Sequence, residues 1–194
     1  RSVPFSPKRT MVGTLGSPAQ TDIRFSTERT HFSMSGSFAV AAANFGEGSA
    51  DVALESADIE PYLIMNAVGL PQLGGGMAVK ANAKVAVDAQ KIAFSSVGGQ
   101  VGGNPFSGNL AVQRAAPYPV SGDLSVRTAD LAWLGDAIYG PVIDPENGAL
   151  NAKPLAMAAF PQLKASLSLK AENFEAGPFG TITGLAAKVT HDSG

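Results

Sequence analysis

The stretch from residue 77 to residue 88 alternates between apolar and mainly polar side chains. Its apolar positions are Met77, Val79, Ala81, Ala83, Val85 and Val87, and the positions between them include Lys80, Asn82, Lys84, Ala86 and Asp88. Successive side chains of a strand point to opposite faces, so this pattern predicts a strand with one apolar and one wetted face. At ~3.3 Å per residue it would reach ~40 Å, well beyond the common strand length. Such a strand indicates an extended or strongly curved sheet.

The same alternation returns between residues 163 and 172. Leu163, Ala165, Leu167, Leu169 and Ala171 stand opposite Lys164, Ser166, Ser168, Lys170 and Glu172. One apolar face and one polar face are typical of half-buried antiparallel strands. Residues 98–105 and 115–119 are rich in glycine or proline and are interpreted as hairpin connections. Together these segments predict an antiparallel meander.

Two sequence motifs recur at one offset. The motif at residues 35–40 (SGSFAV) returns at 107–112 (SGNLAV), and that at 51–59 (DVALESADI) returns at 123–131 (DLSVRTADL), an offset of 72 in both cases. Two matches in one register are hard to obtain by chance, so the chain is interpreted as repeating a unit of several strands followed by a short helix. A third Ser-Gly copy begins at Ser121, which suits a strand adjacent to the second copy.

Helical signal is confined to two segments, residues 58–69 and 130–140. Each opens on an aspartate, Asp58 or Asp130, suited to cap a helix, and each closes near a glycine. Ile59, Tyr62 and Leu63 share one stripe of the first segment. We expect both helices to dock on the sheet. The fold class predicted is therefore mainly β: a long, curved antiparallel meander with short capping helices near 58–69 and 130–140.

Composition excludes several classes of protein. The chain has no cysteine, which rules out disulfides, thiolate zinc sites and cysteine nucleophiles. A net charge of −2 does not fit a basic nucleic-acid binder. No apolar run of about 18 residues is present to span a bilayer as a helix. The chain starts without methionine and ends directly after a strand-like stretch, so we expect a segment of a longer protein, with any signal or anchor outside it.

Catalytic motifs are missing as well. His31 and His191 lie far apart and belong to no zinc-binding pattern, and neither a Gly-x-Ser-x-Gly elbow nor a phosphate-binding glycine loop is present. Asp51, Asp58, Asp123 and Asp130 recur equivalently in the two copies and are interpreted as turn and cap residues. The sequence predicts no enzyme, no metal site and no cofactor.

From residue 58 onward the order of motifs becomes specific. A capped helix is followed by Gly69-Leu70-Pro71, the long alternating strand, the glycine-rich turn at 98–103, the motif at 107–112, Pro117, the Ser-Gly-Asp-Leu at 121–124 and the Ala-Asp-Leu-Ala-Trp-Leu at 129–134. In this order the chain resembles AsmA-like proteins of the bacterial envelope, over residues from about 35 to 190. The motifs are degenerate individually, and their order and spacing carry the resemblance.

The resemblance implies a fold and a function. AsmA-like proteins are anchored in the bacterial inner membrane by an N-terminal helix, and their periplasmic part is a repeating β-groove thought to carry phospholipid. We therefore expect a non-enzymatic periplasmic segment that serves lipid transport and outer-membrane biogenesis, with the anchor outside this chain. Its expected divisions are N-terminal strands at 1–34, a first repeat at 35–106, and a second repeat with the start of the next at 107–194.

The apolar rows of the strands are the expected lipid-contacting surface. The residues predicted to contact lipid are Val79, Ala81, Ala83, Val85, Val87, Leu110, Val112, Leu124, Val126, Leu163, Leu167 and Leu169. Each methylene buried there would gain ~0.8 kcal/mol, so about ten would offer roughly 8 kcal/mol before entropy costs. The expected partner is a phospholipid or another acyl-chain lipid. The sequence leaves open a closed arrangement, in which the rows pack on the short helices and on another sheet.

A second class of function fits the same strands. A β-rich structural or adhesive repeat module would bind protein partners through the unpaired groups of its edge strands. Ser, Thr and Asn on the polar faces fit this alternative, whereas the aspartate-capped helices after strands do not fit a plain sandwich array. A homodimer formed through exposed strands is also left open.

Overall fold

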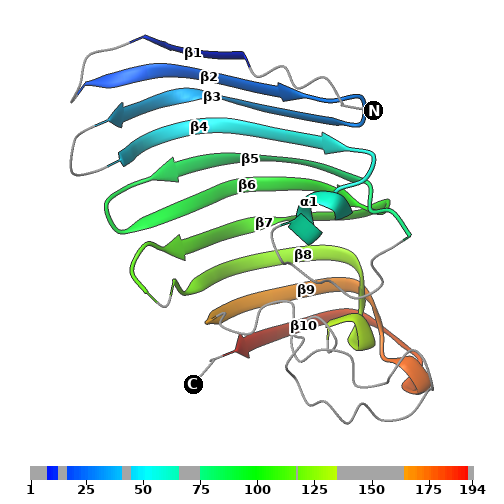
Figure 1. The fold of residues 1–194 in the computed structure, drawn as a ribbon. Helices are drawn as coiled ribbons and strands as arrows, with labels where there is room; N and C mark the ends of the chain where they lie inside the picture. The colour runs from blue at the N-terminus through cyan, green and yellow to red at the C-terminus, as the bar shows by residue number, and fades with distance from the viewer. Residues whose placement is uncertain are drawn as a thin grey trace.

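The computed structural model describes residues 8–12, 17–40, 45–65, 75–116, 118–134 and 164–191. These residues form one ten-stranded sheet with short helical segments at one end (Figure 1). The predicted mainly β fold is confirmed.

The strands are long, as the alternation predicts. They are β1 (Lys8–Val12), β2 (Pro18–Ser26), β3 (Thr30–Val40), β4 (Phe45–Ser56), β5 (Val79–Val87), β6 (Lys91–Val101), β7 (Asn104–Gln113), β8 (Val120–Asp130), β9 (Ala165–Glu175) and β10 (Thr181–His191). β5 lies inside the alternating stretch predicted at 77–88, and the alternation of half-buried and exposed side chains runs through all of β5. The period-two pattern therefore locates this strand well.

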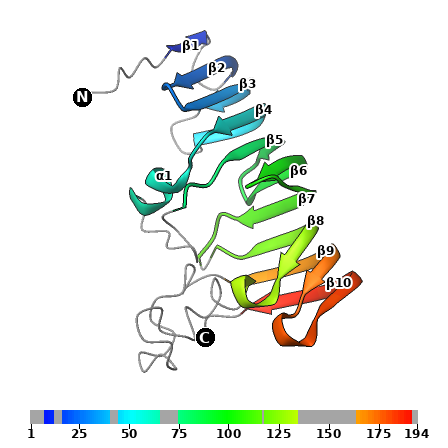
Figure 2. The ribbon, with the colours of Figure 1, turned by 90° about the vertical axis from the view of Figure 1, so that its right-hand side faces the viewer.

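The strands lie in the sheet in chain order. Eight of the nine neighbouring pairs are antiparallel, so the predicted meander is confirmed for these pairs. β1 and β10 each pair with one neighbour among the described strands, which leaves this sheet open rather than closed into a barrel. Figure 2 shows it as a single curved layer with a helix to one side.

The pairing of β8 with β9 differs from the expectation. The alternating stretch at 163–172 was expected to pair in antiparallel fashion throughout, but β9 is antiparallel only to β10 and runs parallel to β8. Val120 pairs with Ala165 at one end of this pair and Asp130 with Glu175 at the other. A parallel pair requires a crossover of a dozen or more residues, and the segment 131–164 is long enough to supply one.

The turn between β6 and β7 is shorter than the glycine-rich stretch suggests. Gly98 and Gly99 belong to β6, and only Gly102 and Gly103 form the turn. Both turn glycines have positive φ, 56° and 81°, which a two-residue type I′ hairpin requires. The connection predicted at 115–119 does join two strands, β7 and β8.

Both expected helices are present within the residues that the structure describes. Helix α1 spans Glu60–Met65, and residues 131–134 form a helical turn directly after β8; residues 66–69 and 135–140 of the expected helices lie outside the described part of the chain. Asp58 Oδ1 accepts the N–H of Glu60 and also that of Met77 just before β5, both at 3.1 Å. Asp130 Oδ1 accepts the Trp133 N–H at 2.7 Å. The two aspartates therefore cap their helices as predicted.

The other two recurring aspartates are not turn residues. Asp51 lies within β4 opposite Ser35, and Asp123 lies within β8 opposite Asn109. Asn109 Nδ2 donates to Asp123 Oδ1 at 3.3 Å, while Asn109 Oδ1 accepts the backbone N–H of Ser96 at 3.1 Å. Ser96 has φ of 50° and belongs to a β-bulge in β6. The Asn109 side chain therefore stabilises this bulge, and a bulge bends its strand.

The glycines of the repeated Ser-Gly motifs have the same structural role. Gly36 lies in β3 and Gly108 in β7, each in the first strand of a strand–strand–helix unit. A Cβ at Gly36 would overlap the backbone oxygen of Ser49, and one at Gly108 would overlap that of Asp123 on the facing strand. The glycines therefore permit a close approach of neighbouring backbones in both units.

Candidate functional site

The register places the residues predicted for β5 on one face of the sheet. Val85 pairs with Ala50 of β4 on one side and with Phe94 of β6 on the other. Val87 pairs likewise with Gly48 and Ile92. Directly paired residues project on the same side of a sheet, so the Val79–Val87 row continues into both neighbouring strands.

The same face continues across the second half of the sheet. Leu110 pairs with Phe94 and Gly122, and Gly122 pairs in turn with Leu167. Leu124 pairs with Leu169 in the parallel β8–β9 pair. The register also unites Val112 with Ile92, and Val126 with Phe106. All of the residues predicted to contact lipid except Leu163, which lies outside the described residues, therefore share one face, called the apolar face below.

The apolar face extends further than predicted. On β3 it includes Phe32, Met34 and Phe38, which pair with Leu54, Val52 and Gly48 of β4. On β2 it includes Ile23 and Phe25, and on β10 it includes Leu185 and Val189. The signal for β3 was available, because Phe32, Met34 and Phe38 alternate with His31, Ser33 and Ser37.

Most large side chains of this face are only half-buried. Among the described residues, the buried apolar ones are Ala19, Ala50, Ala129, Ala165, Leu169, Ala171 and Ala176, of which only Leu169 is large. The described strands form a single sheet, so among them no second sheet packs on the apolar face. Because most of these side chains are half-buried, part of the apolar surface of this face is exposed.

Helix α1 covers one end of the apolar face. The Tyr62 ring meets the Phe25 ring edge to face, with centroids 6.4 Å apart and planes at 87°. At the paired ends of β3 and β4, the hydroxyls of Thr30 and Ser56 are buried and lie 2.7 Å apart, and Glu60 at the start of the helix is buried. The predicted docking of this helix on the sheet is confirmed.

A hollow of about 790 Å³ lies on the apolar face beside the second helical turn. Its apolar lining includes Phe106, Leu124, Val126, Trp133, Leu134 and Leu169. At its edge, Asn104 Nδ2 donates to the Thr128 carbonyl at 2.7 Å, and Asn104 Oδ1 accepts the Thr128 N–H at 3.1 Å. The volume falls in the ~300–1,000 Å³ range of small-molecule sites, and the mainly apolar lining fits a hydrocarbon ligand.

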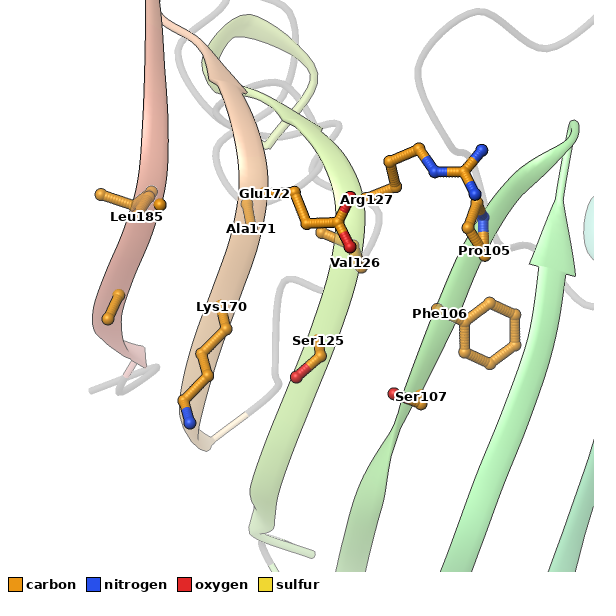
Figure 3. Close-up of a pocket in the computed structure, with 12 residues that line it drawn as sticks. Pro105, Phe106, Ser107, Ser125, Val126, Arg127, Lys170, Ala171, Glu172 and Leu185 are labelled. Atoms are coloured by element: carbon orange, nitrogen blue, oxygen red, sulfur yellow. The ribbon is translucent and has the colours of Figure 1, made fainter.

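The opposite face carries the polar side chains. Lys80 and Glu55 form an exposed ion pair at 3.7 Å. A second hollow, of about 580 Å³, lies between β7 and β10, and Figure 3 shows Ser107, Ser125, Lys170 and Glu172 projecting from the strands there. Arg127 extends from β8 toward Pro105. Within the described ranges no three His, Cys, Asp or Glu side chains gather as metal ligands.

His31 pairs with Glu55 on the polar face, and the carboxyl group of Asp88 lies in the β5–β6 turn. His31 Nδ1 lies 2.7 Å from Ser26 Oγ, and His191 pairs with Ala165 at the end of β10. The carboxylate of Asp88, in the β5–β6 turn, accepts the backbone N–H groups of Gln90 and Lys91 at 2.8 Å each. These bonds, and secondarily the Lys91 and Arg114 charges, hold the pKa of Asp88 below its ordinary value.

No helix in the described part of the chain has the length and apolarity needed to cross a membrane. No family model, curated protein or solved structure matches this chain.

Proposed function

We propose that the apolar face binds acyl chains of phospholipid, and that the chain is a periplasmic segment of an AsmA-like protein that acts in lipid transport and envelope biogenesis. The observation that supports this proposal is the continuous row of half-buried apolar side chains across β2–β10 on a single-layer sheet. Such a surface matches hydrocarbon, which needs no polar partner. The order of sequence motifs supports the family part of the proposal.

The energy available on this face is adequate for binding. About ten methylenes placed in the hollow and along the adjoining rows would gain roughly 8 kcal/mol at ~0.8 kcal/mol each, before the entropy of association is subtracted. The abundance of alanine on this face leaves room for a chain, since Ala81 and Ala83 stand between Val79 and Val85. The chemistry is binding, without a reacting group.

The test compares lipid bound to matched variants. The chain is purified under mild conditions, and native mass spectrometry followed by solvent extraction identifies and counts copurifying lipid. Val85→Asp places a charge on the apolar face between Ala50 and Phe94, whereas Ala86→Asp places the same charge on the exposed opposite face one residue away. We expect the first variant to lose lipid and the second to retain it, while both keep a β-sheet circular dichroism spectrum.

Two results would overturn the proposal. A lipid-free wild-type chain that stays lipid-free when phospholipid is added is one of them. Equal lipid content in the wild type, Val85→Asp and Ala86→Asp is the other, because lipid would then sit elsewhere. Leu167→Asp, with Ser168→Asp as its control, repeats the comparison on β9, so a folding defect of one variant does not decide the outcome.

A further inference from the structure

Several large apolar side chains are exposed, and they are unevenly distributed over the molecule. Among the described residues, Phe179 is 86%, Met65 82% and Ile64 61% exposed. The apolar rim, as we call it, comprises Ile64, Met65, Val101, Leu131, Phe179 and Ile182. Exposed apolar side chains that gather in one region of a protein commonly mark a site of protein or membrane contact.

All members of the apolar rim lie at one end of the sheet. Ile64 and Met65 end α1, which follows β4; Val101 ends β6; Leu131 follows β8; Phe179 and Ile182 flank the start of β10. Figure 1 shows α1, the helical turn after β8 and the β9–β10 turn together on the right of the sheet. The one further large apolar side chain that is described as exposed, Tyr118, lies at the opposite end, between β7 and β8.

The described charged groups around the apolar rim have an acidic excess. Glu28, Glu172 and Glu175 are exposed against Arg29 and Arg127, and Glu172 lies level with Arg127 on the neighbouring strand. Lys80 and Glu55, also near this end, pair with each other at 3.7 Å. The carboxylates of Asp58 and Asp130 cap helices here, and Glu60 is buried. The described part of this end therefore carries apolar side chains among an excess of acidic groups, which fits a partner without net negative charge and does not favour an anionic one.

We infer that the apolar rim inserts into the surface of a zwitterionic lipid bilayer. Its side chains sit on separate turns and helix ends between β4 and β10, spread over roughly 30 Å at ~4.8 Å per strand. A protein partner needs a contiguous, complementary patch, whereas a lipid interface accepts isolated apolar tips. Contact with a bilayer goes beyond the proposed function and does not require it, although it would lay one edge of the apolar face beside a source of lipid.

The absence of cysteine allows this contact to be mapped one residue at a time. Phe179→Cys and Met65→Cys are each labelled with an environment-sensitive nitrobenzoxadiazole dye, and Tyr118→Cys provides the control at the opposite end. On addition of phosphatidylcholine vesicles we expect a blue shift and a several-fold rise in emission at 179 and 65, with little change at 118. An unchanged signal at 179 and 65, or an equal change at 118, would overturn the inference.

Vesicle flotation provides the second measurement. Met65→Ser combined with Phe179→Ser should lower partitioning onto phosphatidylcholine vesicles by about tenfold or more, while Tyr118→Ser leaves it unchanged. Because phosphatidylcholine carries no net charge, partitioning should vary little between about 0.05 and 0.5 M salt, where screening would remove an electrostatic attraction. Binding that appears only with anionic lipid, or that survives the double substitution, contradicts the inference.

The two proposals fail separately. If the rim variant loses vesicle binding but keeps copurified lipid, both the membrane contact and the acyl-chain site stand. If Val85→Asp has no effect on lipid content while the rim still binds vesicles, only the proposed function fails. Specific capture of a protein by the apolar rim, without vesicle binding, would replace the lipid bilayer with a protein partner.

Discussion

The two strand–helix units of the chain can be compared element by element. The first comprises β3, β4 and α1, and the second comprises β7, β8 and the helical turn at 131–134. Both carry the Ser-Gly motif in their first strand and an aspartate cap at their helix. After the helix they diverge, because β5 runs antiparallel to β4 whereas β9 runs parallel to β8. A repeated local motif therefore does not decide the direction of the strand that follows it.

The surroundings of the two units also differ in burial. Beside the first unit, α1 rests on β2 through Tyr62 and Phe25. Where the second unit meets β9, Ala129, Leu169 and Ala171 are buried as a cluster, and half-buried side chains pack against it: Leu124, Val126, Leu134, Phe174, Leu185 and Val189. The better-packed part of the described sheet therefore lies where β8 meets β9 and β10, and the 790 Å³ hollow lies beside it.

The largest expected effect tests this difference in packing. Leu169→Ala removes the buried leucine of the cluster and should lower the free energy of unfolding by about 3 kcal/mol. Leu54→Ala, at a half-buried position on β4, should cost about 1 kcal/mol, because its lost contacts are fewer and solvent fills the space. Urea unfolding followed by circular dichroism measures both. Equal losses would show that β4 and the region around β8 and β9 are packed alike.

The next largest expected effect tests the glycine of the Ser-Gly motif, which both units share. Gly36→Ala and Gly108→Ala should each cost about 2 kcal/mol, because the added methyl group meets a backbone oxygen on the facing strand in both units. Gly75→Ala is the control: a Cβ there meets no atom within 4 Å, and the change should stay within about 0.5 kcal/mol. The same unfolding experiment applies, and a harmless substitution at either Gly36 or Gly108 would separate the two units.

The smallest expected effect is a pH dependence of stability that the β5–β6 hairpin has and the β9–β10 hairpin lacks. Asp88 in the β5–β6 turn has a pKa below its ordinary 3.8, so its stabilisation is complete above that value and is lost as the pH falls through the lower, folded pKa. The β9–β10 turn instead closes through the Ala176 N–H and the Gly180 carbonyl at 2.9 Å, with no titrating group in that bond. Carboxyl chemical shifts measured by NMR during acid titration should give an Asp88 pKa under 3.8. An unshifted pKa would remove the distinction.

The sequence pattern predicted some elements closely. The alternation at 77–88 anticipated β5, the cap aspartates anticipated both helices, and the residues predicted for lipid contact share one face wherever they are described. These features depend on residues near one another in the chain. Side-chain direction in a strand has period two, and a cap acts over three residues, so both can be inferred from a short window.

Other features escaped prediction because they depend on distant residues. Gly98 and Gly99 continue β6 rather than forming its turn, since their partners on β5 and β7 hold them in the ladder. The contribution of Phe32 and Met34 to the apolar face becomes evident once β3 pairs with β4. The role of Asn104 as a bridge to Thr128 is equally absent from any local pattern.

By itself, the sequence determined that this protein has long strands with one apolar face, hairpin turns between several of them and two capped helices, because these follow from local periodicity and backbone preferences. Only the tertiary structure decided that β9 lies parallel to β8, that the hollow forms beside Trp133, and that the exposed apolar tips gather at one end. Those properties arise from contacts between residues far apart in the chain. Strand direction and the position of a turn in space depend on where the returning chain finds a free sheet edge.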